Sequence, residues 1–202
     1  MIGIGDNMFS PDSNITRAQY VTMLMRMMDY NMTGYDPMPF SDLVEGSWYY
    51  ESVCKAAALG VIPWSQDVFG PHEVITREEM FVMTYEVLAQ FYLILPYDGG
   101  ADNGADNGAD NGADADADND ADNGDTDESK TSPLDVFSDA SDVSPEYYDA
   151  VSEIVRNGLA QGADGLLRPN ANLSRAEAAQ FLTNVVRFIV PDYTEILKDI
   201  SK

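Results

Sequence analysis

A short pattern recurs three times in the chain: a proline stands five residues before a Thr or Ser, and an Arg follows that hydroxyl residue directly. In each copy a Glu or Gln follows the hydroxyl residue by three positions, the spacing of a helix capping box. The pattern therefore predicts three helices that begin at equivalent places, at about residues 16–31, 76–95 and 174–190. The three copies are Thr16-Arg17-Ala18-Gln19, Thr76-Arg77-Glu78-Glu79 and Ser174-Arg175-Ala176-Glu177.

The arginine of each copy is not explained by helix initiation. At the first helical position its charge lies beside the positive end of the helix dipole, which costs about 0.3 to 1 kcal/mol at an exposed site. Two interpretations stay open at this point. Each arginine can reach a carboxylate or an aromatic ring of a neighbouring segment, or it can bind an external anion.

Longer repeats surround this pattern. With an offset of 98 residues, Tyr49 matches Tyr147, and Gly60 matches Gly158. Each full copy is predicted to contain a first helix, a loop and a second helix. The first helices are expected to begin at Ser47 or Trp48 and at Ser144 with Pro145, and to end near the two glycines. The first copy begins midway, and nothing before Met1 supplies its first helix.

The second helices are apolar over much of their circumference, which predicts that they are buried. We therefore expect an all-α fold with three tandem helix-loop-helix repeats in a pseudo-threefold arrangement around a central three-helix bundle. The expected domains are a partial repeat at 1–35, full repeats at 36–96 and 133–190, a linker at 97–132 and a tail at 191–202.

The predicted linker is acidic and of low complexity. Between Ala101 and Glu128 there are 11 acids and no base, and Asn, Asp, Gly and Ala alone fill Ala101 to Asp125. Such a segment has almost no apolar surface to bury, so it is predicted to be extended and disordered. Its alternating aspartates do not follow the register of a calcium-binding EF-hand loop. No metal site is expected.

Charge and motif content exclude several classes of function. The net charge of -24 argues against nucleic acid or an anionic membrane as a partner, and no apolar stretch predicts membrane insertion. No nucleophile elbow, phosphate loop or metal-spaced His and Cys set is present. We therefore expect neither an enzyme nor a cofactor.

The order and spacing of these motifs resemble those of the S-layer homology domain. The resemblance lies in Phe-Ser-Asp, an aromatic-rich helix, a glycine, and Phe or Leu two residues before Pro, followed by the Thr-Arg-x-Glu-like capping motif. It implies three repeats that anchor exported proteins without covalent bonds to a secondary cell wall polysaccharide carrying pyruvylated sugar. The implied location is extracellular, at the cell wall.

In this family the ligand grooves lie between neighbouring repeats, where the motif arginine faces the acidic sugar. The resemblance implies a ligand-binding role for the arginines, their capping neighbours and a few supporting residues. These residues are Arg17, Arg77, Arg175, Thr16, Thr76, Ser174, Gln19, Glu79, Glu177, Trp48, Asp42, Asp139 and Gly162.

Differences between the copies predict that the three grooves are not equivalent. Where the third repeat has Gly162, the second has Trp64, which could block or reshape its groove, and Gln19 replaces an acid in the first. A second functional class also stays open: a protein–protein or self-assembly module that meets other surface-layer subunits, with the arginines structural.

Overall fold

The computed structural model describes residues 9–28, 40–64, 67–94 and 131–190, and these residues form an all-α fold. The predicted fold class is therefore confirmed. Within these ranges only isolated β-bridges accompany the helices. The helices are α1 (Arg17–Met28), α2 (Tyr50–Ala58), α3 (Arg77–Gln90), η1 (Pro133–Val136), η2 (Ala140–Asp142), η3 (Pro145–Tyr147), α4 (Tyr148–Arg156) and α5 (Arg175–Ile189).

The three long helices α1, α3 and α5 begin at the motif arginines, as the capping pattern predicts. The Thr76 hydroxyl accepts from the backbone N–H of Glu79, and the Glu79 carboxylate accepts from the backbone N–H of Thr76. Ser174 and Glu177 form the same box at α5, and Thr16 with Gln19 forms it at α1. Each cap satisfies helix N–H groups that would otherwise lack a partner.

The shorter helices α2 and α4 begin later than the sequence predicts. Turns occupy residues 47–49, so α2 begins at Tyr50, and the 3-10 helix η3 precedes α4. Ser144 does not cap its own helix, because its N–H and hydroxyl both donate to the buried Glu78 carboxylate, at 3.0 and 2.8 Å. These two hydrogen bonds hold the start of the third repeat against α3.

A closed ring of backbone hydrogen bonds joins the three repeats just before the long helices. The N–H of Ile15 donates to the carbonyl of Leu173, Leu173 donates to Ile75, and Ile75 donates back to Ile15, all at 3.0 to 3.1 Å. These three side chains are fully buried. The ring places the three helix starts side by side.

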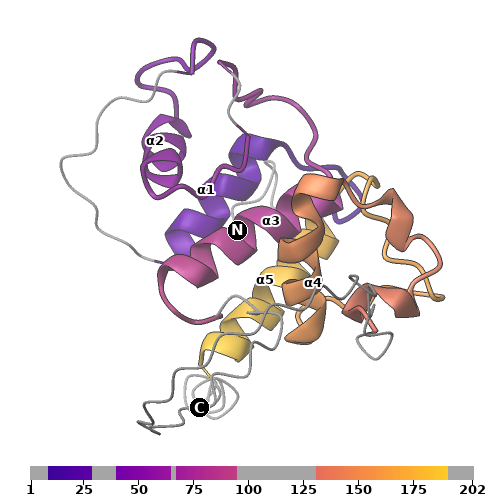
Figure 1. Cartoon of the computed structure of the whole chain (residues 1–202). Coiled ribbons are helices and arrows are strands. Elements are labelled where there is room, and N and C mark those ends of the chain that lie inside the picture. Colours follow the sequence, from indigo (N-terminus) through magenta and orange to yellow (C-terminus); the bar gives the residue numbers. More distant parts are fainter. Residues whose placement is uncertain (1–8, 29–39, 65–66, 95–130, 191–202) are drawn as a thin grey trace, which may run out of the picture.

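Helix packing follows the order of the ring. In Figure 1, α2 lies beside α1 and α4 beside α3, while α3 passes between the others. The hydroxyl of Tyr20 meets that of Thr84 at 2.6 Å between α1 and α3, and the rings of Phe81 and Phe181 meet at 5.4 Å between α3 and α5. The three second helices are thus in contact through α3. A described first helix is present only in the second and third repeats, so the pseudo-threefold arrangement of whole repeats stays a prediction.

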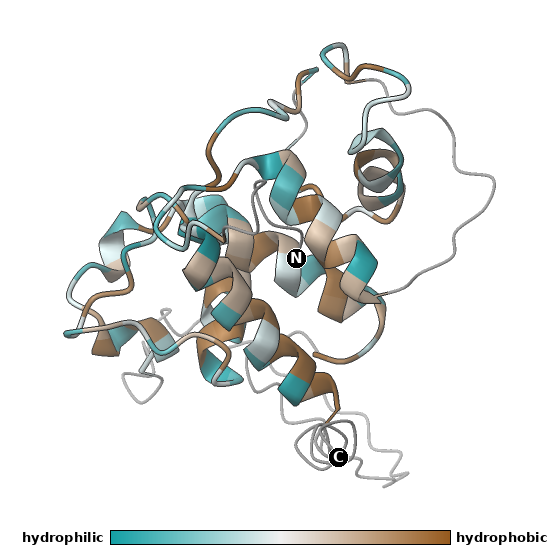
Figure 2. Ribbon diagram, turned by 180° about the vertical axis from the view of Figure 1, so that it is seen from behind, coloured by the Kyte–Doolittle hydropathy of each residue, from teal (hydrophilic) through white to brown (hydrophobic). Residues whose placement is uncertain are grey.

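The core explains why α3 carries apolar side chains over much of its circumference. Its Met80, Phe81, Met83 and Leu88 are all fully buried, and each such side chain stabilises the fold by about 2 kcal/mol. Figure 2 shows brown, apolar segments where the helices face one another and teal, polar segments toward the outside. The predicted linker at 97–132 lies outside the described residues except for its last two positions, and the tail at 191–202 lies wholly outside them.

Candidate ligand-binding junctions between repeats

Each motif arginine extends from its own helix into the next repeat. There it donates to the carbonyl of the residue two positions before the repeat's proline. Arg17 donates to Phe69 at 3.3 Å, Arg77 to Leu167 at 3.0 Å, and Arg175 to Phe9 at 2.8 Å. We name these places junction 1–2, junction 2–3 and junction 3–1 after the repeats they join.

In junction 1–2 the protein itself supplies most of the partners of the arginine. Arg17 donates to both oxygens of Glu79, at 3.3 and 2.5 Å, and its Nη1 also pairs with Glu73. Burial disfavours the charged form, but the hydrogen bond and charge of Glu79, with the charge of Glu73, outweigh it. The pKa of Arg17 is therefore raised above its usual value. Four of the five N–H donors that a guanidinium has are engaged.

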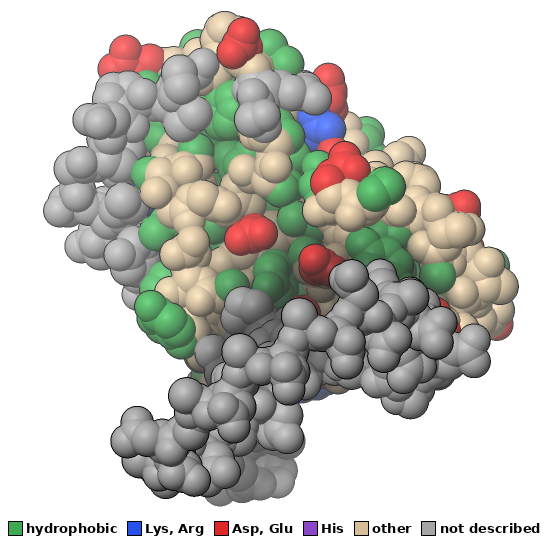
Figure 3. Space-filling view, viewed as in Figure 1, with side chains coloured by type: hydrophobic (Ala, Val, Ile, Leu, Met, Phe, Trp, Pro, Cys, Tyr) green, Lys and Arg blue, Asp and Glu red, His purple; other side chains and the backbone are tan. Residues whose placement is uncertain are grey.

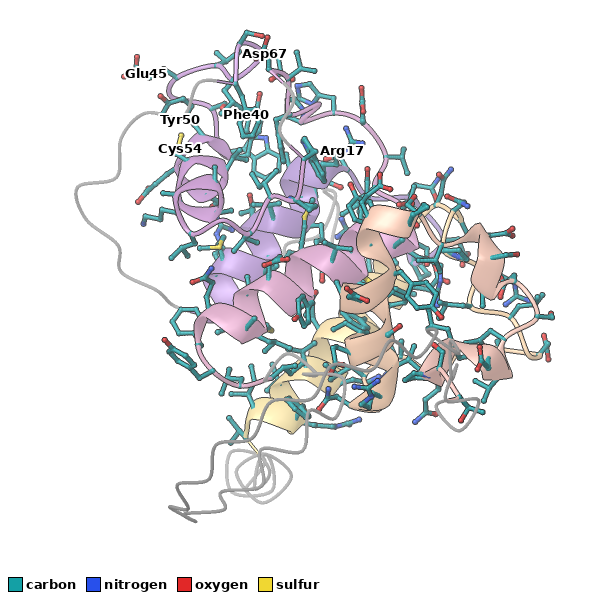
Figure 4. The ribbon with its side chains drawn as sticks, viewed as in Figure 1. Arg17, Phe40, Glu45, Tyr50, Cys54 and Asp67 are labelled. Atoms are coloured by element: carbon teal, nitrogen blue, oxygen red, sulfur yellow. The ribbon has the colours of Figure 1, made fainter. Side chains whose placement is uncertain are left out.

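Trp64 covers the same guanidinium. The arginine carbon lies 4.7 Å from the centre of the indole ring, which stacks on Phe69 at 5.9 Å. Figure 4 shows Arg17 at the start of α1, beneath the loop of the second repeat. The indole N–H of Trp64 is buried and has no hydrogen-bond partner among the described residues. Junction 1–2 is thus filled by an aromatic ring and two carboxylates.

Junction 2–3 has the same plan but leaves its arginine less satisfied. Arg77 donates through Nε to Leu167 and through Nη1 to Glu177 at 3.3 Å, and its guanidinium lies 5.5 Å from the Phe81 ring. Two of its five N–H donors are thereby engaged among the described residues, which leaves three. Burial lowers the pKa of Arg77, Glu177 only partly offsets this effect, and the charge of Arg168 adds to it.

Junction 3–1 combines a backbone contact with an aromatic one. The guanidinium of Arg175 lies 5.2 Å from the Phe9 ring, next to the carbonyl that accepts its Nε–H. Where the other junctions have a glutamate, Gln19 carries no charge, and its amide oxygen accepts from the N–H of Thr16. This junction therefore lacks the carboxylate of the capping box.

The predicted aspartates support the loops that the arginines contact. Asp42 accepts from the N–H groups of Phe69 and Gly70 at 2.8 and 2.7 Å. Asp139 accepts from those of Leu167 and Arg168 at the same two distances. Burial opposes the shift, but these hydrogen bonds hold the pKa of Asp139 below its usual value. Both aspartates fix the carbonyl that the arginine meets, so their geometry is that of positioning residues.

The remaining predicted residues take three different positions. The hydroxyls of Thr16, Thr76 and Ser174 are engaged in the helix caps. Trp48 is 56% exposed and meets Tyr49 edge-on at 5.2 Å, and none of its ring contacts among the described residues involves a motif arginine. Gly162 has φ +62°, and a Cβ there would lie 2.5 Å from Leu166 O and from the Phe137 ring. The backbone and Phe137 therefore account for this glycine.

Sequence reasoning missed Glu73 and Arg168. Both lie in the loop before a motif helix, where single charged residues are common and carry no distinctive signal. Glu73 has no counterpart in the other copies, since Ser13 and Ala171 occupy its position. That difference between the copies was the available clue.

Comparison with known proteins identifies the family. A sequence profile of the S-layer homology domain matches residues 1–21, 39–81 and 136–179, which make up more than half of the chain. This chain belongs to the S-layer homology domain family. Domains of this family are non-catalytic modules that anchor proteins at the cell wall and cell surface.

Similar S-layer homology segments occur in large glycan-degrading enzymes. The chain is 32% identical over 92 residues to an amylopullulanase of Thermoanaerobacterium thermosulfurigenes and 29% identical over 92 residues to exoglucanase XynX of Acetivibrio thermocellus. These alignments cover 44% of the chain but 5% and 8% of the two enzymes. An endoglucanase of Bacillus sp. (strain KSM-635) is 25% identical over 186 residues, 91% of the chain and 16% of that enzyme. The chain thus spans only a small part of each relative.

The described part of the S-layer homology chain offers neither a membrane-spanning helix nor a grouped set of metal ligands. None of the helices described there combines the length and the apolar character that crossing a bilayer requires. In the same ranges, no three His, Cys, Asp or Glu side chains are grouped in a way that could hold a metal ion.

Proposed function

We propose that this chain anchors a protein to the cell wall by binding an acidic, pyruvylated secondary cell wall polysaccharide at the junctions between its repeats. Of the motif arginines, Arg77 and Arg175 are the ligand-binding groups, with their helix caps and Asp139 supporting the loops around them. Arg17, by contrast, is already held by Glu79 and Glu73. The observation that carries the proposal is the state of Arg77. It is fixed at a helix start, its side chain is 17% exposed, and three of its N–H donors have no partner among the described residues.

The chemistry of a pyruvate ketal fits this arginine. Its carboxylate can accept two parallel N–H bonds from a guanidinium, the strongest arrangement for this pair of groups. Burial lowers the pKa of Arg77, which means that the surrounding protein does not fully compensate its charge. A bound carboxylate supplies that compensation. The positive end of the α3 dipole adds to the attraction.

The acidic composition of the chain does not prevent this binding. Charges farther away than about 8 to 10 Å are screened at physiological salt, so the local groups at the junction dominate. Figure 3 shows a small basic patch next to acidic side chains on one face of the molecule. Close contacts with the guanidinium thus outweigh the net charge of -24.

The exposed ring of Trp48 is proposed to stack on an apolar sugar face beside the charged contact. The relatives are named as glycan-degrading enzymes. We therefore also propose that the chain is the anchoring part of an exported surface protein whose activity belongs to other domains.

Co-sedimentation with purified wall polymer tests the proposal. We expect the full chain to bind pyruvylated polymer and to lose most binding when the pyruvate is removed by mild acid. A folded Arg77→Ala, Arg175→Ala double variant should lose binding, whereas Arg187→Ala, a change at an exposed arginine of α5, should not. Equal binding to both polymers, or full binding by the double variant, would overturn the proposal.

A self-assembly module remains the second candidate because apolar side chains are exposed near the start of α2. Val44 is 63% exposed in the same turn region as Trp48. Analytical ultracentrifugation separates the two functions. Concentration-dependent association that a Val44→Ser, Trp48→Ser variant abolishes, without any polymer binding, would favour assembly.

A further inference from the structure

Arg168 follows directly in sequence after Leu167, whose carbonyl accepts a hydrogen bond from the Nε–H of Arg77. Its backbone has φ 55°, in the left-handed region that favours glycine. The equivalent residues of the other repeats, Ser10 and Gly70, also have positive φ, at 47° and 69°. The fold thus requires this backbone conformation, but it does not require an arginine.

The Arg168 side chain makes one weak, exposed ion pair among the described residues. Its backbone N–H is held by Asp139 at 2.7 Å, so the position of the residue is fixed. Its guanidinium pairs with Asp164 at 3.7 Å, and these side chains are 46% and 89% exposed. An exposed pair at that distance contributes little to stability.

Arg77 donates to Glu177 at 3.3 Å and to the carbonyl of Leu167, the residue next to Arg168, so Arg168 belongs to the same junction. Burial raises the pKa of Glu177, but hydrogen bonds with Ser174 lower it. The charges of Arg77 and Arg168 lower it further, so the pKa lies below its usual value. Burial lowers the pKa of Arg77, Glu177 partly offsets this, and the charge of Arg168 lowers it further. Two guanidinium groups that repel each other at one junction form a suitable site for an anion with more than one charge.

We infer that Arg168 is a second ligand-binding cation, which together with Arg77 allows junction 2–3 to hold two neighbouring negative groups of one saccharide segment. The inference rests on the proposed function and goes beyond it, because Arg168 stands outside the capping motif. Junctions 1–2 and 3–1 have Gly70 and Ser10 at this position. At this position only junction 2–3 has a cation, so the proposed two-point contact is assigned to that junction.

The substitution Arg168→Gly provides a sharp test. Glycine adopts the left-handed conformation without strain and reproduces Gly70, so this variant should fold at least as well as the unmodified chain. Titration of the full chain with purified pyruvylated polymer, monitored by biolayer interferometry, should show about five- to tenfold weaker binding. The salt dependence of binding should also become shallower, because one cation has been removed.

Matched variants define the outcomes. Arg168→Lys keeps the charge and should recover part of the affinity, while Arg187→Gln removes an exposed charge elsewhere and should change affinity less than twofold. Unchanged affinity and salt dependence in Arg168→Gly, with binding abolished by Arg77→Ala, would overturn this inference and leave the proposed function standing. Failure of the unmodified chain to bind any wall polymer would overturn both.

Discussion

Junctions 1–2 and 2–3 are built from the same motif but leave their arginines in opposite states. Arg17 has two carboxylates and an aromatic ring around it, and its pKa is raised. Arg77 has one carboxylate at 3.3 Å, and its pKa is lowered. The two junctions differ at three positions, with Glu73 against Ala171, Gly70 against Arg168 and Trp64 against Gly162. They also differ in that Glu79 accepts two hydrogen bonds from its arginine and Glu177 accepts one. We therefore propose that the repeated motif forms an internal ion pair in junction 1–2 and an anion site in junction 2–3.

The largest expected effect is on stability. Arg17→Ala leaves the Glu79 carboxylate, which is largely buried, without its partner, and after allowance for solvent screening this costs about 2 kcal/mol. Arg77→Ala should cost about half of that or less, because Glu177 is nearly half exposed. Urea unfolding monitored by circular dichroism measures both. Equal losses in the two variants would remove the distinction between the junctions.

The second expected effect is on polymer binding, where the loss should be larger for Arg77→Ala than for Arg17→Ala. Arg77→Ala should weaken binding to pyruvylated polymer by about tenfold or more, because it removes the guanidinium that keeps three N–H donors without a partner in the described part of the chain. A folded Arg17→Ala chain should bind within about twofold of the unmodified chain, since its donors are already engaged. Biolayer interferometry at a temperature where both variants are folded gives the comparison. Stronger loss from Arg17→Ala would show that junction 1–2 is the binding site.

A smaller effect is expected when the ion pairing in junction 1–2 is loosened. Glu73 pairs with Arg17 through a side chain that is 65% exposed, so Glu73→Gln should change stability by less than about 0.5 kcal/mol. In an Arg77→Ala background it should raise residual polymer binding by about threefold, because a neutral amide accepts from Arg17 more weakly than a carboxylate does, so that donor can turn to the ligand. The gain is limited by Glu79, which stays in place. No gain in the double variant would mean that Trp64 alone closes this junction.

The smallest effect is a pH dependence at junction 2–3. Burial raises the pKa of Glu177, but hydrogen bonds from Ser174 and the charges of Arg77 and Arg168 together outweigh burial. Glu177 therefore has a pKa below its unfolded value of about 4.3. Its contribution is therefore complete above about pH 4.3 and is lost as the pH falls through the lower folded value. Urea unfolding at pH 6 and pH 3.5 should show a smaller acid-induced loss for Glu177→Gln than for the unmodified chain. An identical loss in both would contradict this assignment.

The sequence predicted what is decided locally. Capping boxes depend on residues three positions apart, so the starts of α3 and α5 could be placed to within one residue. The start of α4 was placed too early, since Ser144 bonds to Glu78, a residue 66 positions away. That contact depends on tertiary packing, which local rules do not contain.

The site was predicted in outline for the same reason. The arginines stood out because they oppose the helix dipole in every copy. Which partner each one meets depends on which loop faces it, and Glu73 looks like any other charged loop residue until the repeats are closed into a ring. Gly162 has a structural role that the sequence did not reveal, because its φ is positive and a Cβ there would meet Phe137. The ligand-binding role that the family resemblance implies for it stays a prediction.

The most direct test of the central claim observes the arginine side chains themselves during binding. In a nitrogen-15 NMR titration with a soluble pyruvylated fragment of the wall polymer, the Nε–H signal of Arg77 should shift while that of Arg17 stays in place. Equal shifts of both signals, or saturating binding with no shift of Arg77, would contradict the account.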